Sequence, residues 1–304
     1  MRSSNLIRQC LALSSQVVAM LNCLPRIAAR RTLVKVAYFV LGLTISVACA
    51  DRAFADDTLR DLCPDRPGKG TSACTLDAGY FQLESDLFNG TVQRSGAITT
   101  DTYYVTNPNL KYGVSDDFDI ELNLAPDVIV RMHDAENGLT QTWSGIGDLY
   151  LRAKWAAIGN SGSDFALAIE PYLKLPTAQI GIGNGAIEGG VVMPISLSLG
   201  DDWSLGSTPE VDMLKNAVSY GRHLSLTDVI GIGRTIGSGV TLGAEIWEST
   251  NLDPSGTTQS WSFDLDGAWQ PDGSPDLQLD VGINLGLNHN TPGSQVYVGI
   301  SRRF

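Results

Sequence analysis

Two side chains of the types that carry out nucleophilic catalysis stand two positions apart, His223 and Ser225. In a β-strand, residues i and i+2 point to the same face, so the imidazole and the hydroxyl would be neighbours. An imidazole in that position can take the proton of a serine hydroxyl and make the oxygen a nucleophile toward an ester. No convincing third member follows in the sequence, so hydrolysis is the minor hypothesis.

A pair of cysteines offers a different chemistry. Cys63 and Cys74 are the only cysteines beyond residue 55, and a stretch rich in proline and glycine separates them. An even pair in an exported protein is typical of a disulfide, and closing this loop would contribute roughly 3 kcal/mol on the chain-entropy account. Two thiols without nearby histidines do not make a zinc site. We therefore predict a disulfide, no metal and no cofactor.

Charged residues recur at alternate positions in several stretches. From Phe118 to Leu124, apolar residues alternate with polar or charged ones without exception, and residues 277–287 repeat the pattern. This period of two is typical of strands with one apolar and one polar face. No window of ordinary helix length shows the corresponding helical period. The chain is therefore predicted to be all-β.

If the apolar faces meet lipid, the opposite faces place charges inside a barrel. Arg152 and Lys154 lie on one stretch and Glu170 and Lys174 on the next, so opposite charges are expected to pair across strands. Such charges would select or orient solutes, or they would only satisfy each other in a polar interior. The residues predicted to line the lumen and govern its selectivity are Glu84, Lys111, Glu121, Asp148, Arg152, Lys154, Glu170, Lys174, Glu210, Asp212, Glu245, Asp264 and Asp280.

Twelve stretches that can position these side chains follow one another along the chain. Most have ten to thirteen residues, close to the ~9–11 that a tilted strand needs to cross a bilayer. The stretches are 79–88, 101–114, 118–126, 146–157, 164–176, 188–199, 203–213, 221–233, 239–249, 259–270, 276–288 and 295–304.

The connections between these stretches alternate in length. Short turns rich in glycine and aspartate at 115–117, 200–202 and 237–239 take turns with longer segments, of which 126–145 is the longest. An outer-membrane barrel has this asymmetry, with tight periplasmic turns and longer external loops. Together with the even strand count, it favours a transmembrane, antiparallel, up-and-down β-barrel of about twelve strands over a soluble sandwich.

The end of the chain supports the same interpretation. Phe304 closes a final apolar alternation and resembles the C-terminal assembly signal of outer-membrane barrels. Prolines argue the other way, because proline removes a ladder hydrogen bond and a closed barrel has no edge strand for it. Bulges are expected to absorb Pro171, Pro194 and Pro209. The tryptophans are expected mostly near strand ends, in aromatic girdles.

The first 55 residues differ from the rest. They hold seven basic residues and one acidic residue, whereas residues 56–304 hold 14 basic and 32 acidic ones, a net charge of −18. A basic region, the uncharged run 36–50 and small residues up to Ala55 predict a secretory signal peptide cleaved after Ala55. A permanent N-terminal anchor or a lipid on Cys49 is the weaker alternative. The acidic remainder argues against nucleic-acid binding.

Five segments carry a family resemblance: CPDRPGKG from residue 63, AGYFQLE from 78, NLKYGV from 109, GDLYLRAKW from 147 and EPYLKLP from 170. They resemble the MetA-pathway phenol-degradation family of outer-membrane transporter-like proteins, over about residues 60–304. The resemblance implies a membrane barrel that passes small organic, including aromatic, compounds. It supplies no catalytic residues.

These observations predict three parts and a function. The parts are the leader 1–55, a disulfide-bearing segment 56–77 that is periplasmic or a plug, and an outer-membrane barrel 78–304. The function is passive passage of a small organic solute, with that solute, outer-membrane lipid and the barrel-assembly machinery as partners. The alternatives are an outer-membrane enzyme of phospholipase type using His223 and Ser225, and a structural or adhesive barrel that transports nothing.

Overall fold

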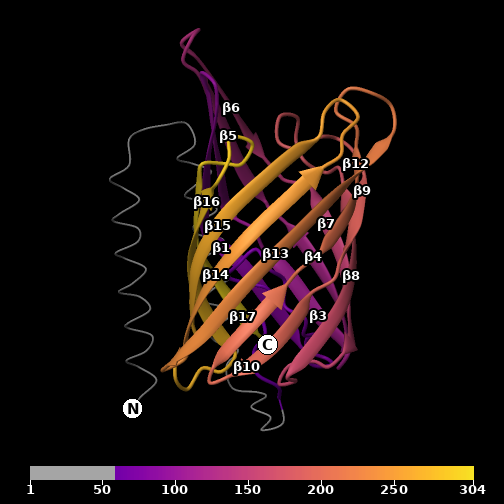
Figure 1. Cartoon of the computed structure of the whole chain (residues 1–304), viewed down its shortest axis with the longest axis vertical. Coiled ribbons are helices and arrows are strands. Elements are labelled where there is room, and N and C mark those ends of the chain that lie inside the picture. Colours follow the sequence, from indigo (N-terminus) through magenta and orange to yellow (C-terminus); the bar gives the residue numbers. More distant parts are fainter. Residues whose placement is uncertain (1–58) are drawn as a thin grey trace. The chain divides into compact units, whose positions relative to one another are not determined.

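The computed structural model describes residues 59–304, so the predicted leader 1–55 lies outside the described residues. Within them the fold is all-β, and 17 strands form one sheet that closes into a 12-strand antiparallel barrel (Figure 1). The first strands are β1 (Phe81–Ser95), β2 (Ile98–Thr106), β3 (Asn109–Ser115), β4 (Phe118–Leu124), β5 (Asp127–Asp134), β6 (Leu139–Gly145), β7 (Leu149–Ile158) and β8 (Phe165–Leu175). The others are β9 (Glu188–Val192), β10 (Ile195–Gly200), β11 (Trp203–Ser207), β12 (Glu210–Lys215), β13 (Arg222–Gly237), β14 (Val240–Asn251), β15 (Thr258–Trp269), β16 (Leu277–Gly286) and β17 (Ser294–Arg303).

The barrel closes where the first strand meets the last. β1 pairs with β17 along one edge, and with β2 and β3 along the other. At the seam, the Phe81 amide donates to the Phe304 carbonyl at 3.1 Å, and the Phe304 amide donates to the Phe81 carbonyl at 2.8 Å. The last residue of the chain therefore completes the ladder, which leaves no unpaired edge there.

Some of the 17 strands are two halves of a single membrane-crossing segment, separated where a proline interrupts the hydrogen-bond ladder. β9 and β10 are separated at Pro194, and β11 and β12 at Pro209, so the bulges predicted within continuous strands are wrong at these two positions. Proline has no amide hydrogen to donate, and the strand simply ends at each. Pro171 stays inside β8, at a place where the β7–β8 ladder skips from the Arg152–Tyr172 pair to the Trp155–Ile169 pair.

The outward face is apolar and the inward face is charged. In β4, Ile120 and Leu122 are 47% and 43% exposed, whereas Asp119 and Glu121 are 1% and 4% exposed. A protein surrounded by water shows the reverse order, because exposing apolar surface and burying charge both cost free energy. The exposed apolar belt therefore faces lipid, and the barrel belongs in the outer membrane.

The tight turns at residues 116–117, 201–202 and 238–239 lie at one end of the barrel, and at one of them Asp201 (φ 49°) and Asp202 (φ 64°) form a two-residue hairpin turn. Both residues have the left-handed backbone that such turns require. We call this end periplasmic, because outer-membrane barrels carry their short turns there. The opposite end carries the longer connections and is called the outer end. No described helix has the length and apolar character of a membrane span.

The prediction of a long loop over residues 126–145 is wrong. This segment continues as β5 and β6, which pair in register from Val128–Gly145 to Asp134–Leu139. Figure 1 shows the hairpin rising beyond the neighbouring strands at the outer end. Its polar run in β6 has no apolar partner face, because above the lipid both faces of the hairpin meet water. The period-two signal is therefore weak in this segment.

The tryptophans are divided between the two faces. Trp155, Trp203, Trp261 and Trp269 are 37–51% exposed on the outside, as a girdle requires. Trp247 instead lies in the lumen, with the Lys69 ammonium 4.4 Å from its ring centroid. The girdle prediction is therefore wrong for Trp247.

Candidate functional site in the barrel lumen

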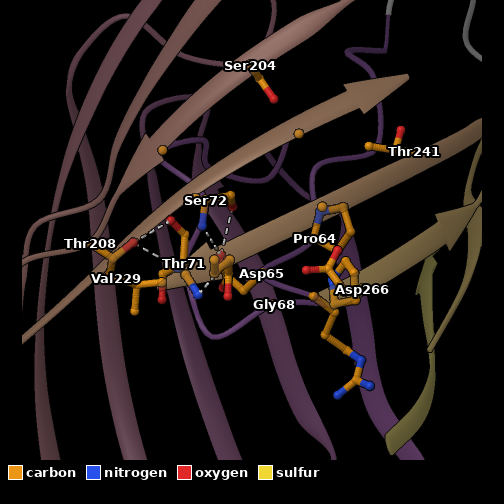
Figure 2. A pocket seen from close by; sticks show the side chains of 18 of the residues that line it. Pro64, Asp65, Gly68, Thr71, Ser72, Ser204, Thr208, Val229, Thr241 and Asp266 are labelled. Carbon is orange, nitrogen blue, oxygen red and sulfur yellow. Dashed lines mark hydrogen bonds between the residues drawn. The ribbon is translucent and has the colours of Figure 1, made fainter. Parts of the chain in front are cut away.

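A disulfide-closed loop, residues 63–74, lies within the lumen and is called the lumen loop. Cys63 and Cys74 are bonded with their Cα atoms 6.4 Å apart, which confirms the predicted disulfide. Side chains of the loop contact the inner face on several sides, through strands that lie far apart in the sequence. Figure 2 shows Thr71 of this loop beside the wall residue Thr208, whose Oγ1 accepts a hydrogen bond from the Thr71 amide at 3.1 Å.

Asp65 connects the lumen loop to two lysines of the wall. Its Oδ1 lies 2.7 Å from Lys154 Nζ, and Lys111 Nζ contacts its Oδ2. Its backbone amide donates to Glu84 Oε2 at 3.0 Å. Burial alone would raise the pKa of the Asp65 carboxyl, but the ammonium groups of Lys111 and Lys154 lower it well below its usual range. Asp65 therefore stabilises the docked loop above the ordinary carboxyl pKa and loses this effect only at strongly acid pH.

The wall lysines are themselves part of a buried ion network. Lys154 Nζ lies 3.2 Å from Glu170 Oε2 and 3.4 Å from Glu121 Oε1. Arg152 Nη1 donates to Glu170 Oε1 at 3.0 Å, and Lys111 Nζ lies 2.7 Å from Glu84 Oε1. The predicted cross-strand pairing of Arg152 and Lys154 with Glu170 is confirmed.

Three carboxylates of this network, those of Asp65, Glu121 and Glu170, have oxygens within 4.8 Å of one another. That spacing would suit a cation, but the ammonium of Lys154 contacts all three. The lysine supplies the positive charge that a metal would otherwise bring, so the cluster is an ion-pair network.

Arg66 binds two further carboxylates, on β1 and on β16. Its Nη1 donates to Asp86 Oδ1 at 2.7 Å, and its Nη2 and Nε donate to Asp280 at 2.8 and 3.1 Å. A Cβ at Gly299 would stand 2.0 Å from Arg66 Nη2, so only glycine leaves room for the guanidinium there. The paired geometry on Asp280 is the strong, directional form of arginine recognition.

Lys69 provides a third attachment. Its Nζ donates to Ser262 Oγ at 2.6 Å and lies 3.3 Å from Asp264 Oδ2, while its backbone amide donates to Glu245 Oε2 at 2.7 Å. Burial lowers the pKa of the Lys69 ammonium, and the charge of Asp264 opposes that shift. A charged side chain of the loop, Lys69, and charged side chains of the wall, Asp264 and Glu245, therefore both contribute to this attachment.

A cavity of about 200 Å³ lies beside the lumen loop, against the wall formed by β11, β13 and β14 (Figure 2). Its wall is made of small residues, because glycines occupy inward positions on all three strands. A Cβ at Gly243 would stand 2.5 Å from the Asp266 carboxylate, whereas one at Gly206 would meet no atom closer than 3.8 Å. The missing side chains leave space beside the loop.

At the outer end a second cluster holds a long connection, residues 176–187. Lys174 Nζ lies 2.8 Å from Glu188 Oε2 and 3.2 Å from Asp148 Oδ2, and it donates to Asn184 Oδ1 at 2.7 Å. The amide of Ala178 donates to Asp148 Oδ1 at 3.0 Å. The connection is thereby bound to the inner wall at two points.

The structure turns the predicted lumen residues inward. Nine are buried, namely Glu84, Lys111, Glu121, Lys154, Glu170, Lys174, Asp212, Asp264 and Asp280. Asp148, Arg152, Glu210 and Glu245 are partly exposed. Sequence reasoning missed their partners Asp65, Arg66 and Lys69, although three charged residues inside a disulfide loop were a usable signal.

His223 and Ser225 are both buried on the inner face. His223 Nδ1 lies 3.0 Å from Asn216 Oδ1 and 3.3 Å from Asp253 Oδ2, and its Nε2 has no hydrogen-bond partner among the described residues. Hydrogen bonding from the Ser255 side chain lowers the pKa of Asp253 to about 2. The histidine thus has carboxylate and amide neighbours that the sequence did not reveal, but no hydrogen bond between Ser225 and His223 is found in residues 59–304.

Comparison with known proteins decides the family. Residues 64–304 match the family described as "Putative MetA-pathway of phenol degradation". The chain belongs to this family. No curated protein matches it significantly.

Solved structures similar to this phenol-degradation family member are outer-membrane barrels. The COG4313 outer membrane channel from Pseudomonas putida F1 has a TM-score of 0.60 at 15% identity, covering 79% of this chain and 99% of that chain. The NanC porin has a TM-score of 0.46 at 10% identity, covering 72% and 98%. The CymD monoaromatic hydrocarbon channel has a TM-score of 0.40 at 10% identity, covering 75% and 88%.

Proposed function

We propose that the protein is a passive outer-membrane channel for a small organic solute, aromatic or hydrophobic, and that the lumen loop is its plug. The cavity of about 200 Å³ between the loop and the small-residue wall carries the proposal. A barrel with a purely structural role would have no need to keep space beside a charged, disulfide-closed loop. The inner charges then select or orient the solute.

The family and fold support this function. The family description refers to phenol degradation, which favours an aromatic solute. The similar barrel from Pseudomonas putida F1 is named an outer membrane channel. The protein uses no cofactor under this proposal, because a solute moving down its gradient needs none. Outer-membrane lipid surrounds the apolar belt, and the assembly machinery recognises the C-terminal Phe304.

Enzymatic activity is the alternative that His223 and Ser225 raise. The Asn216 and Asp253 contacts orient the imidazole as a catalytic base would require. The Ser225 hydroxyl is not hydrogen-bonded to it in the described chain, so we favour a structural role at the outer end. We expect the Ser225→Ala variant and the parent protein to show the same level of lipid hydrolysis. An activity that disappears with this substitution would favour the enzyme.

Filling the cavity tests the channel. We expect Gly206→Phe to lower solute flux and single-channel conductance by at least about half, because an aromatic ring would occupy much of the space beside the loop. The measurements are conductance in planar bilayers and uptake of a panel of aromatic solutes by reconstituted vesicles.

Leu205→Phe is the matched control, because it places the same ring on the same strand but on the lipid face, where Leu205 is 38% exposed. Equal conductance of the two variants would show that the cavity is not part of the solute pathway. Absence of flux for every solute in the panel would favour the structural or adhesive barrel.

A further inference from the structure

A second cavity, of about 320 Å³, lies toward the outer end and is separate from the lumen loop. Its floor and sides come from β2, β4 and β7, through Tyr104, Asn123 and Tyr150. The connection 176–187 closes another side, with Ile182 against the space. We call this space the outer cavity. It assembles side chains from four places in the chain around a volume suited to one small ligand.

The outer cavity presents hydrogen-bonding groups that the protein does not use. In residues 59–304 neither the Tyr104 nor the Tyr150 hydroxyl has a hydrogen-bond partner. The Asn123 side-chain amide donates to Asn107 Oδ1 at 3.1 Å and to the Pro108 carbonyl at 3.0 Å, which fixes its orientation and leaves its own carbonyl oxygen available. The two hydroxyls can therefore donate to or accept from a ligand, and the amide oxygen can accept.

The charges around the outer cavity are already balanced. Arg152 is paired with Glu170, and its guanidinium lies 5.7 Å from the Tyr150 ring centroid and 5.5 Å from that of Tyr172. Asp148 is paired with Lys174. Among residues 59–304, no unpaired cation lines this cavity to bind an anionic ligand, and the acidic lumen would repel a carboxylate.

We propose that the outer cavity is a binding site for a neutral, single-ring aromatic compound bearing one or two hydroxyl groups. The ring would pack against the tyrosine rings and the apolar side chains of Val128 and Ile182, while its hydroxyls reach the free polar groups. This inference rests on the proposed function, because it names the solute that the channel concentrates before it meets the lumen loop.

The connection 176–187 closes one side of the site and is held there by polar contacts. Its attachment through Asp148, Lys174 and Asn184 is polar and lies at the outer end. A Cβ at Gly183 would stand 2.9 Å from Asp148 Oδ2, so glycine permits this close approach.

Calorimetry and ligand-observed NMR on the purified barrel in detergent test the site. Phenol and catechol are expected to bind saturably at one site, with benzoate and glucose at least about tenfold weaker. Tyr150→Leu and Asn123→Leu are expected to weaken phenol binding by about tenfold, and Tyr150→Phe by about three- to tenfold through loss of one hydroxyl.

Tyr220→Leu is the matched control, because Tyr220 is fully exposed at the outer end and should leave affinity unchanged. Retention of the faster-migrating unboiled band in gel electrophoresis shows that each variant is folded. Unchanged phenol affinity in Tyr150→Leu, or tighter binding of benzoate than of phenol, would overturn the proposal.

Gly206→Phe distinguishes the binding site from the channel function, since it should lower flux while phenol binding measured by calorimetry persists. Binding without flux in the parent protein would reject the channel and retain the site.

Discussion

Replacing Asp65, Arg66 and Lys69 together by alanine is expected to convert a mostly closed barrel into one with frequent, large openings. Each side chain makes at least one charged contact with the wall. Charged hydrogen bonds contribute about 1.5–3 kcal/mol each, and every 1.4 kcal/mol changes an equilibrium about tenfold. Losing three or more of them should shift the balance between docked and undocked loop by a factor of about 1,000 or more. Conductance in planar bilayers measures this shift directly.

Arg131→Ala is the matched control for this triple substitution. It also removes one net positive charge, but from the exposed hairpin β5–β6 at the outer end. The wall should survive the triple change, since Lys111 and Lys154 keep the glutamates Glu84 and Glu170 as partners. Conductance equal to that of Arg131→Ala would show that the lumen loop is not a plug.

The barrel itself was predictable from local sequence. The alternation of apolar and polar residues in β4 and β7 indicates which side chains face lipid, and it places Glu121 and Lys154 in the lumen. The final Phe304 was recognised as the chain end of a barrel, and it does lie at the seam. Such features depend only on the period of a strand and on bilayer thickness. The hairpin β5–β6 was missed because it rises beyond the lipid, where no alternation is imposed.

The contacts that give the lumen its character were not predictable. Arg66 and Asp280 are 214 residues apart, and Lys69 and Ser262 are 193 apart. Which wall carboxylate meets which loop charge depends on strand stagger and on the depth of the loop, and neither is encoded in a local pattern. The outer cavity was not predictable either, since Tyr104 and Tyr150 come from different strands and alternation within a strand does not tell which inward side chains meet.

Lys154→Met is expected to destabilise the folded barrel by about 3–5 kcal/mol, the usual effect of removing one partner from a buried ion network. Lys154 is fully buried and contacts Asp65, Glu121 and Glu170. Without it, three carboxylates with oxygens within 4.8 Å of one another face a methionine. Their mutual repulsion and lost solvation are larger than anything the thioether gains by packing. Urea unfolding in lipid vesicles gives the free energy of unfolding.

A compensating change shows whether charge or shape is responsible. Adding Glu121→Gln to Lys154→Met removes one of the three carboxylates that lose Lys154 as a partner, so it should restore part of the lost free energy, whereas a pure packing defect would persist. Lys215→Met removes a lysine whose side chain is exposed and should change the free energy of unfolding by less than about 0.5 kcal/mol. If Lys154→Met unfolds at the same urea concentration as Lys215→Met, the network does not stabilise the barrel. If only loop docking is lost, conductance rises while the unfolding midpoint stays unchanged. The two measurements thus separate a lysine that holds the wall from one that holds the plug.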